Sequence, residues 1–324
     1  MISVAYVNGN STTDPLLTLL PDNLSGPWIE ISKHFDFEPV LNYASSVQFN
    51  WHSPTKKDIN SVKLEDIEIC STITGSLTEV WFYQVSLAIE LESIRIVPII
   101  KNIFSILNSN HNEAKEKIEV QLGNLLNSLK EIGMLLERIH EHCVPSVFYN
   151  GLRPYLSGWN TPGFDKMGGL KFGSAPDAPI YTSTGGSAAQ SPLIQVLDAL
   201  FGVRHLPNPD GSPNYLYLIR KYMPKADRDL ILWVESWGEG FKDFCVENQI
   251  YHPFIDCLSQ MISNRQLHGG IVWKFIKQEA MKLKKDTEAV GTGGTPYEKF
   301  LKSIIGSTQM LKDAFQKKFA ILHN

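Results

Sequence analysis

A histidine lies inside a segment of the chain whose apolar residues recur at helical spacing. Residues 265–275 read RQLHGGIVWKF, and His268 stands seven residues after Met261 and seven before Phe275. Seven residues are close to two turns of an α-helix, so His268 is expected on the same apolar face as these neighbours. A single histidine on an apolar face is more often a hydrogen-bonded core residue than a ligand. The spacing alone therefore favours a core position.

Two glycines follow this histidine and complicate the core interpretation. Gly269 and Gly270 each destabilise a helix interior by about 1 kcal/mol relative to alanine. Their small size makes sense if a broad, flat group such as haem lies against the helix, with His268 as the axial ligand of its iron. Arg265, three residues earlier, would lie one turn away on nearly the same face, where it can bind a carboxylate at the edge of the haem.

A serine in a glycine-rich stretch offers a second kind of chemistry. Residues 184–192 read TGGSAAQSP, and Ser187 stands in a pattern close to the G-x-S-x-G turn of α/β-hydrolases, with alanine in the last position. The preceding residues, PIYTS, are compatible with a short strand, and a helix is expected after the turn. The surrounding chain lacks the alternating strands and helices of that fold, so a turn or capping role is the more common interpretation.

Two further stretches suit ligand binding without forming a catalytic set. Arg153 stands among aromatic residues that include Phe148 and Tyr149, where it either stacks on a ring at the surface or binds a carboxylate in an aromatic pocket. The stretch GTGGT at 291–295 lacks the lysine of a phosphate-binding loop. It is either a flexible linker before a capped helix or a lid whose Thr292 hydroxyl meets a polar ligand.

The elements that must position these residues are predicted to be helices. Leucine and isoleucine recur at spacings of three and four through 112–141, with lysine and glutamate on the opposite face. The segment 76–107 is apolar on most faces, which predicts a buried helix bent near Pro98. Further helices are expected at 24–35, 40–51, 190–203, 212–222, 226–236 and 251–284, and after Thr295. Because convincing strands are few, the chain is predicted to be all-α, with a long irregular segment at 159–189.

Composition and charge argue against several classes of protein. Of 324 residues, 43% are hydrophobic and 20% are charged, which is typical of a globular protein with a large core. The formal net charge of -4 and the lack of a basic run argue against a nucleic-acid partner. There is no stretch of about 20 apolar residues and no signal peptide, so neither a membrane span nor secretion is expected. Four cysteines without a CxxC pair are typical of reduced thiols in a cytoplasmic protein.

Taken together, several stretches of the chain resemble the indoleamine 2,3-dioxygenase family. In the family's order they are NYASSVQFNW, WFYQVSLAIE, FYNGLRPYLSGW, GGSAAQS followed by LDALFG, RKYMP, RQLHGGIVWKFI and GTGGTPYEKFLK. No single stretch decides the matter, but their joint order and spacing over residues 40–305 are specific. The resemblance implies an all-helical, multi-helix large domain that binds haem b. It therefore favours the ligand interpretation of His268.

The resemblance also implies roles for individual residues. His268 would be the proximal ligand of the haem iron, Arg265 would face a haem propionate, and Asp198 would be its acidic partner. The residues implied on the distal side of the haem are Tyr43, Phe82, Ser86, Gly186, Ser187 and Ala188, of which Phe82, Ser86 and Ser187 are the candidates for catalytic roles. The residues implied in substrate binding are Tyr43, Phe148, Tyr149, Arg153 and Thr292, with Arg153 on the amino-acid carboxylate and Thr292 in a lid.

The reaction that the resemblance implies is the insertion of both atoms of O2 across the indole C2–C3 bond of L-tryptophan or a related indole. O2 would bind opposite His268, an electron donor would keep the iron ferrous, and the product would be of the N-formylkynurenine type. None of the matched distal residues supplies a histidine or carboxylate as a general base. The protein would contribute an apolar pocket, orientation through Arg153, and a lid that excludes water.

Other functions stay open beside this one. One is a haem enzyme of the same fold that catalyses a different indole oxidation or rearrangement, and another is a haem-binding protein without tryptophan turnover. A serine hydrolase acting through Ser187 is the third. The assembly is expected to be a monomer or a weak homo-oligomer, with no membrane or nucleic-acid partner.

The chain departs from the family's pattern in two ways. Tyr149 stands where mammalian members have a second phenylalanine, and Ser46 stands where they have cysteine, so the pocket is expected to be more polar. The family's small N-terminal domain is expected to be reduced to a remnant at 1–75, followed by the helical, haem-binding catalytic domain at 76–324. A reduced domain would change the cover over the distal side and hence the affinity for L-tryptophan.

Overall fold

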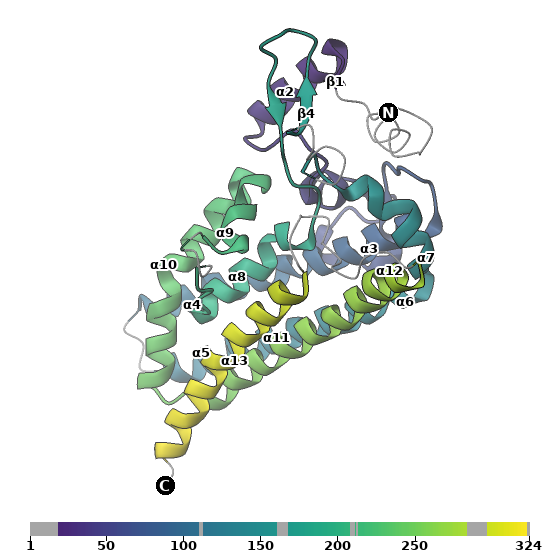
Figure 1. The fold of residues 1–324 in the computed structure, drawn as a ribbon. Helices are drawn as coiled ribbons and strands as arrows, with labels where there is room; N and C mark the ends of the chain where they lie inside the picture. The colour runs from purple at the N-terminus through teal and green to yellow at the C-terminus, as the bar shows by residue number, and fades with distance from the viewer. Residues whose placement is uncertain are drawn as a thin grey trace.

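Long helices account for most of the structure, so the predicted all-α class is confirmed (Figure 1). This computed structural model describes residues 19–109, 113–160, 168–207, 211, 213–283 and 297–322. Its α-helices are α2 (Asp22–His34), α3 (Leu77–Leu91), α4 (Ser93–Leu107), α5 (Ala114–Glu137), α6 (Ile139–His142), α7 (Pro145–Val147), α8 (Pro192–Phe201), α9 (Tyr215–Ile219), α10 (Lys225–Glu247), α11 (Tyr251–Val272), α12 (Gln278–Lys282) and α13 (Tyr297–Leu322).

Short irregular helical turns join these helices. The π-helical turns are η1 (Ala44–Gln48), η4 (Phe148–Leu152) and η9 (Trp273–Lys277). The 3-10 turns are η2 (Ile59–Ser61), η3 (Leu64–Asp66), η5 (Arg153–Leu156), η7 (Ala188–Gln190) and η8 (Arg220–Tyr222). The helix expected at 251–284 is therefore three pieces, α11, η9 and α12, and the helix expected at 40–51 is only the turn η1.

Helix α11 lies between α5 and α13, and these three helices run side by side along the molecule (Figure 1). Leu122, Leu125 and Leu129 of α5 are buried, as their spacing of three and four on one helix face requires. Two polar contacts fix α11 on α5, because the Cys257 thiol donates to the Leu122 carbonyl and the Asn264 amide donates to the Leu129 carbonyl. The half of α11 that follows Asn264 is thereby held in a defined rotation.

Helix α8 packs against α10, and α10 also contacts α4. Gly238 of α10 permits the close approach, because a Cβ atom there would lie 1.9 Å from the Ala199 carbonyl oxygen. Phe201 of α8 meets Phe254 of α11 edge to face, with the ring centroids 4.9 Å apart. These contacts hold α8 beside α11, the helix that carries the predicted ligand.

The apolar segment 76–107 forms two helices rather than one bent helix. α3 ends at Leu91 and α4 begins at Ser93, so the break falls at Glu92, and Pro98 lies inside α4. The predicted bend at Pro98 is therefore wrong in its position. A proline ring clashes with the carbonyl four residues earlier, so the distortion falls in the turn before the ring.

Two small sheets complete the described structure, one beside α2 and the other beside α3. β1 (Leu19–Leu20) pairs in parallel with β4 (Leu170–Phe172), which pairs antiparallel with β5 (Ile180–Tyr181), and β2 (Trp51–His52) pairs antiparallel with β3 (Glu68–Ile69). The register places Leu19 opposite Lys171 and Leu170 opposite Tyr181. α2 and β4 lie together at the upper end of the view in Figure 1. The strand expected before Ser187 is present as β5, and the domain boundary expected at residue 75 stays a prediction.

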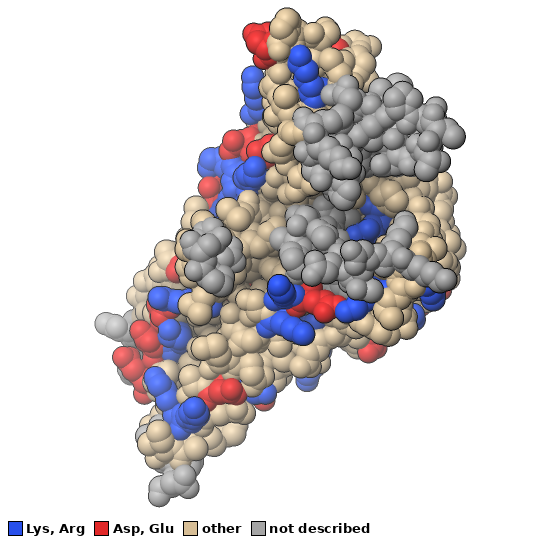
Figure 2. Space-filling view, viewed as in Figure 1, with Lys and Arg blue, Asp and Glu red and all other residues tan. Residues whose placement is uncertain are grey.

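Charged side chains of both signs share the outer surface. Figure 2 shows lysine, arginine, aspartate and glutamate mixed over the described part of one face rather than gathered by sign. Among the described helices, none is both long enough and apolar enough to cross a membrane.

Candidate functional site

A cavity of about 330 Å³ lies where α3, α5, α8, α11 and α13 come together. Its apolar wall includes Phe82, Leu129, Ile132, Phe148, Ile271 and Phe275. The volume lies in the range of small-molecule sites, about 300–1,000 Å³, and such sites combine an apolar wall with a few placed polar groups. The polar groups of this wall are therefore the residues to examine.

The three π-helical turns of the described residues all border this cavity. Ser46 and Val47 line it from η1, Phe148 lines it from η4, and Phe275 lines it from η9. A π-helical turn inserts an extra residue into a helix and is found frequently at functional sites. Three such turns around one cavity indicate that this wall is shaped for a ligand.

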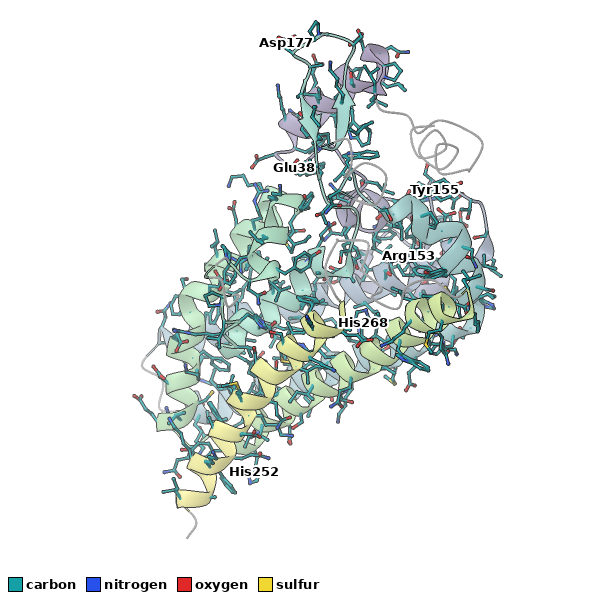
Figure 3. The ribbon with its side chains drawn as sticks, viewed as in Figure 1. Glu38, Arg153, Tyr155, Asp177, His252 and His268 are labelled. Carbon is teal, nitrogen blue, oxygen red and sulfur yellow. The ribbon has the colours of Figure 1, made fainter. Side chains whose placement is uncertain are left out.

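His268 of α11 lines the cavity, and its side chain is only partly accessible (Figure 3). Neither ring nitrogen forms a hydrogen bond with a described residue. Burial lowers the pKa of the His268 imidazole below its ordinary value, so the ring is neutral at pH values near 7. A neutral imidazole with an available nitrogen is the form of histidine that binds a metal. The structure thus does not give His268 the hydrogen-bonded core role that its spacing alone favoured.

Arg265 also lines the cavity and is anchored on its other side. Its guanidinium donates to the Asp198 carboxylate and the Thr308 hydroxyl, and to the Ile304 carbonyl oxygen at 3.2 Å. The ring of His205 lies 2.9 Å from the other oxygen of Asp198. Burial alone would raise the pKa of Asp198, but Arg265 and His205 hold it below its ordinary value. Asp198 is therefore an ionised carboxylate that fixes the arginine at the wall.

Arg153 reaches the same cavity from η5 (Figure 3). Its guanidinium lies over the Tyr149 ring, 5.2 Å from the ring centroid, and Phe148 beside it packs on Phe82 with centroids 5.0 Å apart. Phe148 lines the cavity, whereas Tyr149 is half-buried outside the lining. Arg153 thus stacks on the Tyr149 ring and also lies at the cavity wall, where it can bind a carboxylate. The two interpretations of Arg153 are therefore compatible.

Comparison with known proteins decides the family. The family model described as indoleamine 2,3-dioxygenase matches residues 1–310 of the chain. The chain belongs to the indoleamine 2,3-dioxygenase family. The resemblance recognised in its sequence motifs is confirmed.

Relatives of this family member cover most of its length. It is 30% identical to indoleamine 2,3-dioxygenase 1 of Mus musculus over 322 residues, which is 95% of this chain and 76% of that protein. It is 29% identical to indoleamine 2,3-dioxygenase nanC of Aspergillus nanangensis over 93% of this chain and 76% of that one. It is also 28% identical to a protein named myoglobin from Haliotis madaka, over 90% of this chain and 74% of that one.

The side chains of the cavity fit the haem that the family implies. His268 offers an imidazole nitrogen that no described residue occupies, and histidine is a usual axial ligand of haem iron. Arg265 keeps guanidinium N–H groups beyond those bonded to Asp198, and such groups suit a propionate. The segment 186–188 lines the cavity with small residues, Gly186, Ser187 and Ala188. The donor set therefore provides one ligand for iron and one cation for the edge of the group.

The two glycines after His268 do not line the cavity. A Cβ atom on Gly270 would meet nothing within 4 Å, and one on Gly269 would only touch Leu301 at 4.0 Å. Each residue of a helix turns by about 100°, so Gly270 points away from the face that carries His268. Neither glycine is among the residues that line the cavity, so the structure gives no support to the idea that they thin its wall.

The predicted distal residues Tyr43, Phe82, Ser86 and Ser187 all line the cavity. The Ser86 hydroxyl donates to the Phe82 carbonyl oxygen at 2.7 Å, one turn earlier in α3. The Ser187 hydroxyl accepts from the Ala189 N–H at 3.3 Å and so caps η7. Among the described residues, no histidine or carboxylate forms a hydrogen bond with Ser187, so it has the capping role rather than the geometry of an activated nucleophile.

The segment that carries Ser187 passes close to the end of η5, and Gly185 permits this approach. A Cβ atom on Gly185 would lie 2.0 Å from the Leu156 carbonyl oxygen, so only glycine allows the two backbones to pass. The Gln190 amide donates to the Gly185 carbonyl at 2.9 Å, and its oxygen accepts from the Tyr43 N–H at 2.8 Å. Thr292, the predicted lid residue, lies outside the described residues.

Sequence reasoning missed Glu90, a buried carboxyl group that lines the cavity from α3. It accepts hydrogen bonds from the hydroxyl groups of Tyr43 and Ser191. The available signal was its place in the helix, because Glu90 stands four residues after Ser86, on the same face of an otherwise apolar stretch.

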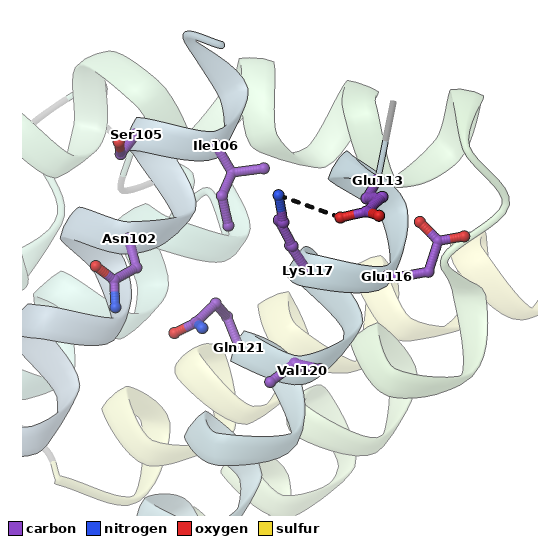
Figure 4. A pocket seen from close by; sticks show the side chains of 8 residues that line it. All are labelled: Asn102, Ser105, Ile106, Glu113, Glu116, Lys117, Val120 and Gln121. Atoms are coloured by element: carbon purple, nitrogen blue, oxygen red, sulfur yellow. Dashed lines mark ion pairs between the residues drawn. The ribbon is translucent and has the colours of Figure 1, made fainter. Parts of the chain in front are cut away.

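A second hollow lies on the outer surface between α4 and α5, away from all of these residues (Figure 4). It is an open groove in which Lys117 and Glu113 form an ion pair at 3.4 Å. Their side chains are largely exposed, and pairs of this kind contribute little. The groove therefore adds nothing to the site.

Proposed function

We propose that the chain is a haem-dependent dioxygenase that inserts O2 across the C2–C3 bond of L-tryptophan or a related indole, giving an N-formylkynurenine-type product. The observation that carries the proposal is the available imidazole of His268 in the wall of a mostly apolar cavity, in a member of the indoleamine 2,3-dioxygenase family. A bound haem supplies the oxygen chemistry, which side chains alone do not perform. The residues of the chain hold that cofactor, orient the substrate and exclude water.

The proximal side of the site holds the cofactor. His268 binds the iron through its neutral imidazole, and Arg265, fixed by Asp198, meets a propionate. On the opposite, distal side, the small residues of the segment 186–188 would leave room for the cofactor. Because Asp198 is ionised and buried beside Arg265, the guanidinium keeps one orientation at the cavity wall.

The distal side of the site orients the substrate. Arg153 binds the carboxylate of the amino acid, and Tyr149 beneath it restricts its motion. Phe82 and Phe148 contact the indole ring, with Tyr43 completing the wall. These groups exclude water from the reacting atoms and confine the substrate to few orientations, which lowers the entropy lost on reaching the transition state.

Polar distal groups are few and engaged. Ser86 donates its proton to the Phe82 carbonyl, so it offers a neighbouring group only a lone pair. Glu90 is the one carboxyl group among the described residues of the lining, and its Oε1 already accepts two hydrogen bonds. We therefore assign Ser86, Phe82 and Ser187 to shaping the site. Thr292 is proposed as the lid residue. The proposal also includes a cytoplasmic location and an external donor of electrons.

A second candidate is a haem protein of the same fold that binds O2 without turning over tryptophan. The similarity to the protein named myoglobin from Haliotis madaka favours it, because that relative covers as much of the chain as some of the dioxygenases do. The cavity residues serve either function equally, since both need an axial histidine and an apolar pocket.

Absorption spectroscopy of the purified protein tests the proposal. The wild type reconstituted with haem is expected to give a Soret band, and His268→Ala is expected to lose it. His252→Ala is the matched control, because His252 is an exposed histidine on the same helix and should keep the band (Figure 3). An unchanged spectrum in His268→Ala would refute the ligand assignment.

Turnover separates the two candidates. Reduced haem protein supplied with O2 and L-tryptophan should form the formylkynurenine product, and Arg153→Ala should reduce kcat/KM by about 100-fold through loss of carboxylate binding. A stable complex with O2 and no product from L-tryptophan would favour the oxygen-binding candidate.

A further inference from the structure

Glu90 is the only carboxylic acid among the described residues that line the cavity. Its side chain is 7% exposed, although it stands in a wall made mostly of apolar groups. A buried carboxyl group is costly unless its oxygens are hydrogen-bonded or paired with a cation. Its contacts therefore decide what it does to a ligand.

The two oxygens of Glu90 are not equivalent. Oε1 accepts from the Tyr43 hydroxyl at 3.1 Å and from the Ser191 hydroxyl, and these donors come from the start of η1 and the start of α8. Oε2 accepts no hydrogen bond from a described residue. One oxygen thus fixes the carboxyl group in place, and the other is left for whatever occupies the cavity.

The charge of Glu90 changes close to neutral pH. Burial raises its pKa to about 7, hydrogen bonds from Ser191 and Tyr43 oppose the rise, and the charge of Asp227 adds to it. Asp227 lies at the start of α10 and accepts from the Gln48 amide of η1 at 3.1 Å. Burial beside Glu90 raises the pKa of Tyr43 well above its ordinary value, so Tyr43 stays a neutral donor.

The other charged or titratable groups of the wall differ from Glu90. Arg265 is neutralised by Asp198, and Arg153 carries a fixed positive charge. His268 becomes positive only below its lowered pKa. Over the range around pH 7, Glu90 is thus the group that switches the cavity between neutral and negative at one wall.

We propose that Glu90 is a specificity-determining residue, whose ionised carboxylate disfavours a carboxylate on the bound indole and favours an uncharged, hydrogen-bond-donating side chain in its place. The inference rests on the proposed function, because it takes the cavity as an indole site. Arg153 attracts a carboxylate at every pH, and Glu90 opposes it once ionised. Acidic indoles therefore bind more tightly as the pH falls, and neutral indoles do not.

A matched pair of ligands tests this. Titration calorimetry on the haem-reconstituted protein measures the Kd of indole-3-propionate and of indole-3-propionamide, which differ in charge but hardly in shape. From about pH 6 to about pH 8 the preference for the amide should rise about tenfold in the wild type, the size expected for two charges about 10 Å apart at an effective dielectric constant of about 20. Glu90→Gln, which keeps the shape and an acceptor oxygen, should reduce the rise to below about twofold.

Two further variants should move the transition in opposite directions. Asp227→Asn removes the neighbouring negative charge and should shift it to lower pH. Ser191→Ala removes a hydrogen bond to the carboxylate and should shift it to higher pH. Both variants remain informative if Glu90→Gln does not fold.

The outcomes separate this inference from the proposed function. Binding of both indoles with the same pH dependence in the wild type and in Glu90→Gln would overturn the role of Glu90 alone. Failure of the protein to bind haem or either indole would instead overturn the proposed function, and the inference with it.

Discussion

Two buried carboxyl groups next to the cavity behave in opposite ways. Glu90 on α3 is 7% exposed and Asp198 on α8 is 3% exposed, so both are almost equally removed from water. Burial is the strongest influence on both and acts in the same direction. Yet the pKa of Glu90 is raised to about 7, whereas that of Asp198 is lowered below its ordinary value.

The difference lies in the partners. Asp198 is bonded to Arg265 and lies 2.9 Å from His205, and a cation offsets the loss of water around a carboxylate. Glu90 is bonded only to hydroxyl groups, whose dipoles offset part of that loss. The cavity thus has a wall whose charge is fixed, beside the predicted proximal ligand, and a wall whose charge responds to pH.

Removing the partner of a fixed charge should have the largest effect. Asp198→Ala leaves the Arg265 guanidinium buried with a single carbonyl and a hydroxyl, so we expect a loss of about 3–5 kcal/mol in the free energy of unfolding. Urea unfolding followed by circular dichroism measures it. Asp198→Asn should cost less, since the amide oxygen still accepts a hydrogen bond. A loss below 1 kcal/mol in Asp198→Ala would contradict the comparison, because the Asp198–Arg265 ion pair would then contribute little to stability.

The responsive wall should appear in the dependence of stability on pH. A carboxyl group whose folded pKa is raised binds more protons in the folded state, so its contribution is present below the unfolded pKa and is lost as the pH rises through the folded pKa. For Glu90 this loss amounts to roughly 3 kcal/mol between about pH 4.5 and about pH 8. Unfolding free energies of the wild type and Glu90→Gln should therefore diverge as the pH rises from about 4.5 to about 7 and stay apart above it, with the variant more stable at high pH.

The sign for Asp198 is the reverse. Its folded pKa is lowered, so its stabilisation is present above the unfolded pKa and is lost only as the pH falls through the folded pKa. Curves for Asp198→Asn and the wild type should therefore differ at neutral pH and approach each other in strong acid, whereas those for Glu90→Gln should separate already between about pH 4.5 and about pH 7. Parallel curves for both variants would contradict the assigned partners.

A substitution away from Asp198 and Glu90 shows how large a change in stability is when no charge is involved. Gly270→Ala on α11 adds a Cβ atom that meets nothing within 4 Å, so it should stabilise the protein by up to about 1 kcal/mol at every pH. Thermal unfolding at two pH values measures this. Haem content should be unchanged, and a loss of haem in Gly270→Ala would restore the idea that this glycine borders the cofactor.

The sequence allowed prediction wherever a periodic pattern decides the outcome alone. The leucines of α5 recur on one face and are buried, and most of the described residues carried over by the family motifs line one cavity. Prediction from the sequence was weaker where the outcome depends on which side of a helix a residue faces. Gly270 follows His268 by two positions and so points to the far side of the helix, a fact that its proximity in sequence concealed.

Long-range contacts explain the residue that was missed. Glu90 stands in an apolar helix as a single acid, and nothing nearby in the chain indicates that its partners are Tyr43 and Ser191, which are 47 and 101 residues away. The end of α3 at Leu91 was equally hidden, because Pro98 suggested a later bend. Such features depend on which segments meet in space, and local spacing carries no record of that.

The wall of the cavity is assembled from segments that are far apart in order of synthesis. Tyr43 lies at the start of η1, and Ile304, which also lines the cavity, belongs to α13, the last described helix. A growing chain that has not yet released α13 from the ribosome holds only part of the pocket, even though its earlier helices can already fold. A group that the pocket binds therefore meets its complete wall only once α13 has been synthesised and has packed on α11.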